Sequence, residues 1–255
     1  MNSALRILEG RAALVTGGGA GIGAAIAMAF AKAGACVALM GRTEAGLNEV
    51  ADRIKVGGGA ATIHVCDMTD TAAVTAAIAS LPALDILVNN AGTNIPEPML
   101  DVTEEHLDTM LNLNVRSLYL TSQAATRKML EREDRPAFGG CIINISSQMG
   151  HVGSPDRTVY CMTKHAVEGL TKAMALELAP HAIRVVTLCP TFVDTPLVRR
   201  VVDTEEKRAR LFSRIPMGRL GTVDEIAATA VFLASPAAGM ITGTHLLVDG
   251  GWTAQ

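Results

Sequence analysis

Seven short hydrophobic runs recur along the chain, and they constrain its fold more than any other feature. They are "AALVTG" (12–17), "CVALMG" (36–41), "ATIHVC" (61–66), "DILVNN" (85–90), "CIINIS" (141–146), "IRVVTLC" (183–189) and "HLLVDG" (245–250). Their apolar residues are nearly continuous rather than alternating with polar ones. This pattern indicates strands that are buried on both faces of a parallel sheet.

Segments with helical periodicity lie between these runs. Residues 21–33, for example, place Ile22, Ile26 and Phe30 on one stripe of a helix. The other predicted helices span 43–55, 69–80, 103–132, 158–179 and 223–234, with Thr103 and Thr222 as N-caps. The repeated alternation of strand and helix predicts an α/β fold. We expect a single doubly wound domain over residues 1–255, with a seven-stranded parallel sheet and helices on both faces.

The stretch 191–221 is less regular than the rest of the chain. It has a charged helical piece between prolines and lies directly after a predicted strand. Long excursions at the carboxyl ends of strands often cover binding sites. We therefore expect a substrate lid at about 191–221.

Charge, cysteine and histidine patterns argue against several classes of protein. The net charge is −3, which gives no electrostatic basis for binding nucleic acid or an anionic membrane. The five cysteines lack a C-x-x-C pair and the six histidines are scattered, so we expect neither a disulfide framework nor a metal site. No run reaches the ~18 apolar residues of a membrane span. We expect a cytoplasmic protein in a reducing compartment.

The turn after the first predicted strand is rich in glycine. It reads "TGGGAGIG" (16–23) and lies between a buried strand and an amphipathic helix. Glycines at 17, 21 and 23 allow a sharp turn and a close approach of the helix N-terminus to a pyrophosphate. The turn predicts a dinucleotide site.

The pentapeptide "YCMTK" holds one of only two tyrosines in the chain. Tyr160 and Lys164 are four residues apart, so they share one face of the predicted helix 158–179. A cation beside a phenol lowers the pKa of the phenol. The pair therefore predicts a tyrosine that acts as a general acid and base. A surface pair without chemistry is the alternative that the pentapeptide alone leaves open.

Taken together, the motifs resemble those of the short-chain dehydrogenase/reductase family. They are the G-x-x-x-G-x-G spacing of the first turn, "NNAG" (89–92), "LNV" (113–115), "INISS" (143–147) and "YCMTK" (160–164). The resemblance runs from "RAALVTGG" to "LLVDGGW". It implies a Rossmann fold and an NAD(P)-dependent oxidoreductase that interconverts a secondary alcohol and a ketone by hydride transfer.

The resemblance also implies four catalytic residues. Tyr160 would donate or accept the proton, and Ser147 would hydrogen-bond the substrate oxygen. Lys164 would lower the pKa of the tyrosine and bind the nicotinamide ribose. Asn114 would hold a water in a proton relay that ends at Lys164.

Cofactor contacts follow from the same resemblance. Besides Tyr160 and Lys164 they are Gly17, Gly21, Ile22, Gly23, Arg42, Asp67, Met68, Asn90, Ala91, Gly92, Pro190, Val193 and Thr195. The chain departs from the family at Thr191, which stands where a glycine usually follows the proline.

The end of the second predicted strand bears on the choice of dinucleotide. Enzymes that prefer NAD usually place an acidic residue there, to bind both ribose hydroxyls. This chain has Gly41 at that position and Arg42 next, whose planar guanidinium suits a 2′-phosphate. Ala20 stands where many NADP enzymes of the family have a second basic residue. We expect NADP to be favoured over NAD.

The substrate is the least determined part of the function. The expected contacts are Thr93, Asn94, Ser147, Gln148, Met149, His151 and Thr191. These polar groups favour a small sugar or polyol, and a 3-oxoacyl thioester or a hydroxysteroid is the alternative within the family. A nicotinamide-cofactor sensor without catalysis is the alternative from another class. The apolar "AMALELA" of helix 158–179 and the resemblance together predict a homotetramer.

Overall fold

The seven hydrophobic runs form one parallel sheet. The computed structural model describes residues 6–133, 139–195, 198–199 and 204–255. Within them the strands are β1 (Ala12–Thr16), β2 (Cys36–Gly41), β3 (Ala60–Val65), β4 (Ile86–Asn89), β5 (Gly140–Ile145), β6 (Ile183–Pro190) and β7 (His245–Val248). Neighbouring strands pair in parallel in the order β3-β2-β1-β4-β5-β6-β7. The predicted fold class is confirmed.

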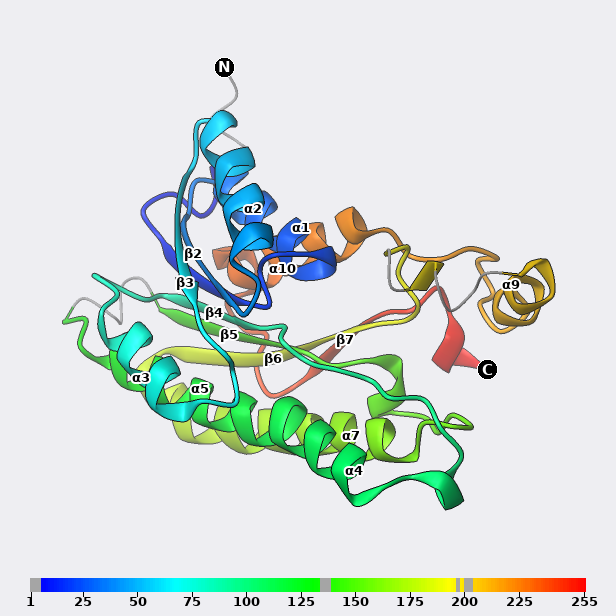
Figure 1. Cartoon of the computed structure of the whole chain (residues 1–255). Helices are drawn as coiled ribbons and strands as arrows, with labels where there is room; N and C mark the ends of the chain where they lie inside the picture. The colour runs from blue at the N-terminus through cyan, green and yellow to red at the C-terminus, as the bar shows by residue number, and fades with distance from the viewer. Residues whose placement is uncertain (1–5, 134–138, 196–197, 200–203) are drawn as a thin grey trace.

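Helices cover both faces of the sheet (Figure 1). One face carries α1 (Gly21–Lys32), α2 (Glu44–Val56) and α10 (Val223–Ala234). The other face carries α3 (Thr71–Ala79), α5 (Ser117–Leu130) and α7 (Thr158–Leu178), with α4 (Glu104–Leu111) next to α7. Short 3-10 helices span Met99–Asp101, Gln148–Gly150, Ala179–His181, Pro236–Ala238 and Trp252–Ala254. Among the described residues, no helix combines the length and the apolar composition that crossing a membrane requires.

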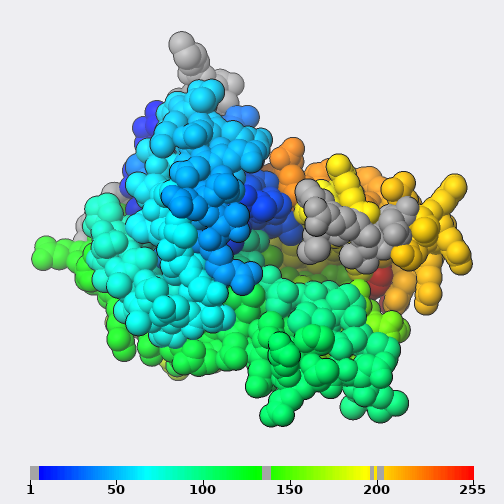
Figure 2. All heavy atoms as spheres, viewed as in Figure 1, coloured from blue at the N-terminus to red at the C-terminus, as the bar shows by residue number. Residues whose placement is uncertain are grey.

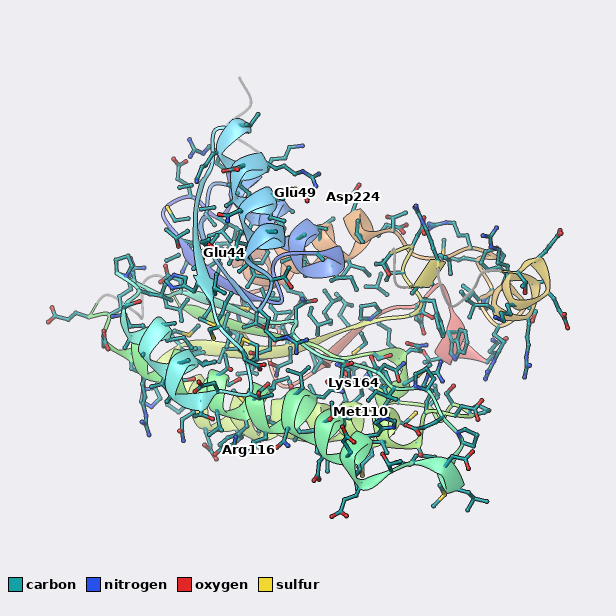
Figure 3. All side chains as sticks on the ribbon, in the orientation of Figure 1. Glu44, Glu49, Met110, Arg116, Lys164 and Asp224 are labelled. Atoms are coloured by element: carbon teal, nitrogen blue, oxygen red, sulfur yellow. The ribbon has the colours of Figure 1, made fainter. Side chains whose placement is uncertain are left out.

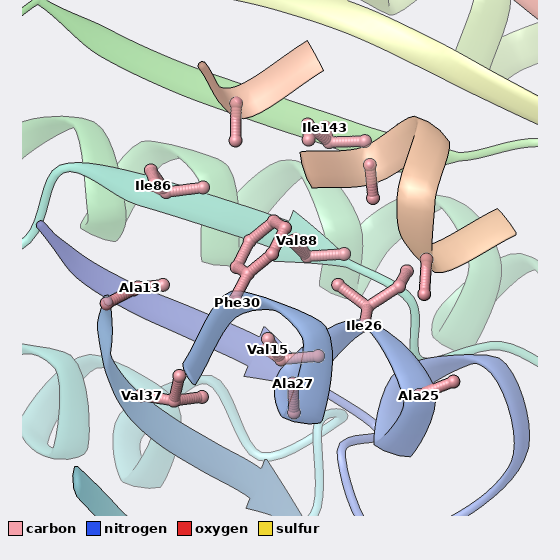
Figure 4. Packing of buried hydrophobic residues seen from close by; sticks show 14 of the residues in the cluster. Ala13, Val15, Ala25, Ile26, Ala27, Phe30, Val37, Ile86, Val88 and Ile143 are labelled. Carbon is pink, nitrogen blue, oxygen red and sulfur yellow. The ribbon is translucent and has the colours of Figure 1, made fainter. Parts of the chain in front are cut away.

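The core explains why the runs are almost continuously hydrophobic. Phe30 of α1 is completely buried and lies over Ile86 and Val88 of β4 (Figure 4). Leu87, between these two residues, belongs to the cluster on the opposite face of the sheet. Successive side chains of a strand point to opposite faces, so both sets must be apolar when helices cover both faces.

The strand order creates a crevice at one edge of the sheet. The chain moves outward from β1 to β2 and β3, and then returns to place β4 on the other side of β1. The loops that follow β1 and β4 therefore diverge at the carboxyl ends of the strands. Ligands of doubly wound sheets bind at such a switch point.

The predicted helix 103–132 has an irregular centre. Thr103 caps α4 as expected, since its hydroxyl accepts a hydrogen bond from the His106 N–H at 3.2 Å. Between α4 and α5, however, Asn112–Arg116 form a π-helical turn. The Ser117 hydroxyl donates to the Leu113 carbonyl at 2.6 Å just after it. A π-turn inserts one residue into a helix without ending it, and hydrophobic periodicity does not report such an insertion.

The excursion after β6 stands at the edge of the molecule. Its helix α9 (Glu205–Phe212) lies apart from the sheet, and the same segment protrudes in the space-filling view (Figures 1 and 2). Val193 forms an isolated parallel bridge with Gly221, which joins the two ends of the excursion. Residues 196–197 and 200–203 of the predicted lid lie outside the described residues.

Candidate active site

A cavity of ≈ 400 Å³ opens at the carboxyl ends of β1, β2 and β4. Many predicted cofactor contacts line it, namely Gly17, Arg42, Asp67, Met68, Ala91 and Gly92. Ala20, Gly41 and Thr43 lie in the same wall. The fold therefore brings together residues that are up to 75 positions apart in the chain.

The glycine-rich turn packs too tightly for side chains. Gly17 has a φ of 63°, and a Cβ on Gly23 would lie only 2.3 Å from the Gly17 carbonyl oxygen. The Asn90 amide donates to the carbonyls of Thr16 at 3.0 Å and of Gly17 at 3.2 Å, which holds the turn against the end of β4. The predicted residues Gly17, Gly23 and Asn90 thus shape one cradle.

The cradle fits the diphosphate of a dinucleotide. The N-cap of α1 is Ala20, which has no side-chain cap, so the first-turn N–H groups of α1 have no side-chain acceptor there. Such N–H groups and the helix dipole favour an anion. Thr195 approaches the same turn, because its Cγ2 is 3.8 Å from the place of a Cβ on Gly21. Ile22 packs inward against the core.

Arg42 and Asp67 face each other across the cavity mouth. The Arg42 Nη1 lies 3.9 Å from Asp67 Oδ2, and both side chains are substantially exposed. The other Asp67 oxygen accepts hydrogen bonds from the N–H and the hydroxyl of Thr69, both at 2.8 Å. These bonds, with a smaller contribution from Arg42, lower the pKa of Asp67. The guanidinium is therefore only loosely held and remains accessible to a ligand.

Ser147 and Tyr160 meet at the end of β5. The Ser147 hydroxyl lies near the phenol of Tyr160, whose pKa it lowers. It also lies 2.7 Å from Gln148 Oε1 and accepts from the Met149 N–H at 3.1 Å. Gln148 and Met149 are both buried, so they contribute to the site by orienting Ser147.

Lys164 is buried beneath the same phenol. Its Nζ donates to the Ile145 carbonyl at 2.8 Å and lies 5.5 Å from the centre of the Tyr160 ring, within cation–π range. Figure 3 shows it between the sheet and α7. Burial lowers the pKa of Lys164 to about 8, although the nearby Cys189 and Glu168 oppose this shift.

The pKa of Tyr160 differs from the sequence-based expectation. Burial raises it to about 12, while the nearby Ser147 side chain and the charge of Arg157 lower it less. The Lys164 ammonium donates to the Ile145 carbonyl instead of the phenol oxygen, and the burial of the phenol decides the direction of the shift. The i,i+4 spacing correctly places the two groups on one helix face, but it does not include the desolvation of the phenol.

Asn114 lies in the π-turn and bonds to two neighbouring segments. Its amide nitrogen donates to the Thr93 carbonyl at 2.8 Å and to the Thr163 hydroxyl at 3.2 Å. Its amide oxygen accepts from the Thr93 N–H at 2.8 Å. The π-turn therefore joins the loop after β4 to α7, one residue before Lys164.

The remaining predicted substrate contacts lie at different depths. Asn94 is exposed on the loop after β4, and Thr93 is half-buried there. Thr191 follows Pro190 and is nearly buried, and its N–H donates to the Val248 carbonyl at 3.2 Å. The Thr191 hydroxyl is buried without a hydrogen-bond partner among the described residues. The replacement of glycine by Thr191 thus leaves the pairing of β6 and β7 intact and adds a polar group.

His151 lies beside a group of residues that sequence analysis did not connect with it. Its Nε2 is 3.5 Å from Glu168 Oε1 and 3.5 Å from Cys189 Sγ, and its ring contacts that of His245. Sequence analysis also missed Gly46 and Leu47 in the cavity wall. Gly46 lies near the start of α2, where a Cβ would lie 2.9 Å from the Gly19 carbonyl oxygen, so a side chain would collide with the glycine-rich turn. The glycine itself, inside a predicted helix, is the sequence signal that could have identified this position.

Comparisons with known proteins agree with this geometry. A protein-family model described as "Enoyl-(Acyl carrier protein) reductase" matches residues 17–253. L-xylulose reductase of Mus musculus is 40% identical over 97% of this chain and 98% of its own. D-threitol dehydrogenase of Mycolicibacterium smegmatis is 40% identical over 96% of this chain and 94% of its own.

A solved structure shares both the fold and the sequence. The gluconate 5-dehydrogenase of Burkholderia cenocepacia J2315, in complex with NADP and tartrate, is 36% identical with a TM-score of 0.92, and the match covers 100% of both chains. The chain described here belongs to the short-chain dehydrogenase/reductase family, a family of oxidoreductases.

The buried ammonium predicts a pH-dependent stability. An unfolded lysine titrates near 10.5, whereas the pKa of Lys164 in the fold is about 8. Between these values the unfolded chain binds a proton that the folded chain does not, so Lys164 makes the fold more stable as the pH rises through this window. Relative to the variant Lys164→Met, the wild type should gain roughly 3 kcal/mol of unfolding free energy between pH 8 and 10.5.

Urea unfolding at several pH values measures this difference. Titrating groups that do not interact with Lys164 contribute equally in both proteins, so their contribution cancels in the comparison. Parallel pH curves for the two proteins would show that Lys164 keeps an ordinary pKa in the fold.

Proposed function

We propose that this chain interconverts a secondary alcohol and a ketone on a small sugar or polyol, with NADP as the favoured dinucleotide. One observation carries the proposal. Ser147 lies near the phenol of Tyr160, Lys164 Nζ lies 5.5 Å from the centre of the same ring, and the group lies at the same edge of the sheet as a cavity whose glycine-rich cradle suits a diphosphate. A binding protein has no use for a positioned hydroxyl, phenol and ammonium together.

Tyr160 acts as the acid and base of the reaction. The bound dinucleotide supplies or accepts the hydride at the substrate carbon. Tyr160 then gives a proton to the carbonyl oxygen or takes one from the hydroxyl, while Ser147 donates a hydrogen bond to the same oxygen. A phenol with a pKa near 12 is protonated at neutral pH, which suits the donor role in ketone reduction.

Lys164 and Asn114 support the proton transfer. The ammonium under the ring favours the phenolate electrostatically as the proton leaves. The Asn114 amide uses both of its N–H groups on Thr93 and Thr163, so a water on a path toward Lys164 would donate to the remaining lone pair of Asn114 Oδ1. The dinucleotide would be held by the residues of the cavity wall and by Asn90, Ile22, Pro190, Val193 and Thr195.

The substrate class rests on relatives and on the polar groups around Ser147. The relatives are named for L-xylulose, D-threitol and gluconate, which are small and polyhydroxylated. Thr191, at the start of the excursion 191–221, has a buried hydroxyl without a hydrogen-bond partner among the described residues, and Asn94 is exposed on the loop after β4. We assign the excursion as the substrate lid.

Substrate turnover tests the reaction and the substrate class together. A panel of ketoses, polyols, 3-oxoacyl thioesters and hydroxysteroids is incubated with NADP(H) and NAD(H), and the absorbance of the reduced cofactor is followed. We expect kcat/KM to be highest with a ketose or polyol. Greater activity on a thioester or a steroid would contradict the sugar or polyol assignment and identify that compound class as the substrate. Cofactor binding without any turnover would favour the sensor.

Tyr160→Phe removes the phenol oxygen and keeps the ring. We expect kcat to fall by about 10³-fold or more while cofactor affinity stays nearly unchanged, because a positioned acid–base group contributes ~10²–10⁴-fold. Tyr119→Phe is the matched control, since Tyr119 lies half exposed on α5 away from Ser147. A Tyr160→Phe variant with a tenth of wild-type turnover would contradict the assignment.

The preference for NADP rests on the end of β2. Gly41 offers no carboxylate to repel a 2′-phosphate, and Arg42 lies next to it in the cavity wall. The Arg42 guanidinium is 71% exposed and only 3.9 Å from its nearest carboxylate, so a phosphate can compete for it. The Burkholderia cenocepacia relative holds NADP in its crystal structure.

Arg42→Ala separates a phosphate contact from stacking on the adenine. If Arg42 makes a charged bond to the 2′-phosphate, the ratio of wild-type to variant kcat/KM should correspond to a loss of about 1.5–3 kcal/mol with NADP and much less with NAD. Arg53→Ala, on the exposed side of α2, is the control and should change neither value. An equal loss with both dinucleotides, or a wild type that favours NAD, would overturn the assignment.

We also propose that the chain is a homotetramer. Leu176 and Met162 of α7 and Tyr119 of α5 are exposed in the isolated chain, with Leu176 81% exposed. Apolar side chains on two adjacent helices indicate a covered face. Sedimentation should therefore show a tetramer at micromolar concentration, and Leu176→Glu should shift it to smaller species. Val56→Glu, at the exposed end of α2, should not. A monomeric wild type would refute the proposal.

A further inference from the structure

Four side chains with metal-binding atoms meet behind the Ser147–Tyr160 pair. His151 follows the 3-10 helix after β5, Glu168 lies on α7, Cys189 is near the end of β6 and His245 begins β7. The ligand atoms of His151, Glu168 and His245 all lie within 4.8 Å of one another. The proposed catalytic chemistry uses none of Glu168, Cys189 and His245.

Three of the four atoms already have the spacing of a tetrahedral site. His151 Nε2 is 3.5 Å from Glu168 Oε1 and 3.5 Å from Cys189 Sγ, and Cys189 Sγ is 3.3 Å from Glu168 Oε1. Zinc binds these atom types at ~2.0–2.3 Å, which places two ligands of a tetrahedron roughly 3.4 Å apart. The triangle of atoms therefore needs little rearrangement to hold an ion.

One oxygen of the buried Glu168 carboxylate has weak partners. The side chain is 9% exposed, and within the described part of the chain its Oε1 contacts a thiol at 3.3 Å and the His151 ring at 3.5 Å. Thiols are weak donors, and an N–H···O bond is normally 2.7–3.2 Å long. A cation bound to Oε1 would satisfy the charge more fully.

The rest of the cluster is organised as a metal site requires. The Thr187 hydroxyl donates to Glu168 Oε2 at 2.8 Å, which fixes the carboxylate from behind. His151 Nε2 faces both Glu168 Oε1 and Cys189 Sγ, so its ring presents a nitrogen to the centre of the cluster. His245 is exposed and contacts the His151 ring at a centroid distance of 4.2 Å, and its ligand atom lies within 4.8 Å of those of His151 and Glu168, which makes it the fourth ligand.

We propose that His151, Glu168, Cys189 and His245 form a site for one divalent transition metal ion of the zinc type. The ion is bound by two imidazoles, one carboxylate and the thiolate of Cys189, whose proton leaves to solvent on binding. A His/Cys/carboxylate set selects zinc and its neighbours over magnesium and calcium, which prefer oxygen ligands alone. The ion and its ligands take no part in the hydride and proton transfers of the proposed reaction.

Zinc binding to the full-length protein without a histidine tag tests the site. The wild type is dialysed against zinc together with a chromogenic chelator, and bound metal is counted by atomic emission. We expect one zinc per chain. Loss of an outer-shell partner already weakens metal binding ~10–100-fold. Removing a ligand with His245→Ala should therefore weaken it at least as much, and Glu168→Gln should do the same.

His181→Ala is the matched control, because His181 is exposed outside the cluster. His245 is itself exposed, so its removal leaves the core intact and any loss of zinc reports the site. Equal zinc binding by the wild type and His245→Ala, or no zinc bound by the wild type, would overturn the proposal.

Cobalt(II) identifies the ligands directly. In the wild type, bound cobalt should give the visible bands of a tetrahedral ion and a sulfur-to-cobalt charge-transfer band. Cys189→Ser should lose the charge-transfer band, whereas Cys36→Ser, at an exposed position of β2, should keep it. A charge-transfer band that survives in Cys189→Ser would place the metal elsewhere.

Discussion

The hydrogen bond from Lys164 Nζ to the Ile145 carbonyl fixes the relation between α7 and the end of β5. β5 leads directly into Ser147, and α7 carries Tyr160. A buried ammonium needs a strong acceptor, and the Ile145 carbonyl provides it at 2.8 Å. The phenol and the serine hydroxyl then lie near each other, because this bond holds the helix that carries Tyr160 against the strand that leads into Ser147. The position of the proposed acid–base group therefore depends on this charged bond.

A chain of buried amides extends the same connection across the sheet. The Asn89 amide donates to Asn144 Oδ1 and to the Ser122 hydroxyl, both at 2.8 Å, and the Asn144 amide donates to the Thr171 hydroxyl at 2.9 Å. These bonds link β4 and β5 to α5 and α7. Apolar packing tolerates small shifts between a helix and a sheet, whereas a fully bonded buried amide does not. The network explains how two long helices position their polar groups within hydrogen-bond distance of the strand ends.

The sequence predicted the strands to within one or two residues, because burial on both faces leaves a continuous apolar run. Motif spacing also identified the residues that gather around the cavity, since Gly17 and Ala91 follow strands that end at one edge of the sheet. Three features could not be predicted. The π-turn at Asn114 leaves the hydrophobic stripe unchanged. The pKa of Tyr160 is set by desolvation, which only packing reveals. The scattered histidines join Glu168 and Cys189 only through the fold.

The residues of α7 that face the sheet form an electrostatic series. Tyr160, Lys164 and Glu168 follow at intervals of four residues, so a phenol, an ammonium and a carboxylate lie along one helical stripe. Burial lowers the pKa of Lys164, and the negative charge of Glu168 partly restores it. The protonation of the ammonium beneath the phenol is therefore favoured by a carboxylate one turn further along the helix. A divalent ion on Glu168 would oppose that ammonium, so the proposed metal site and the acid–base group are coupled through one helix.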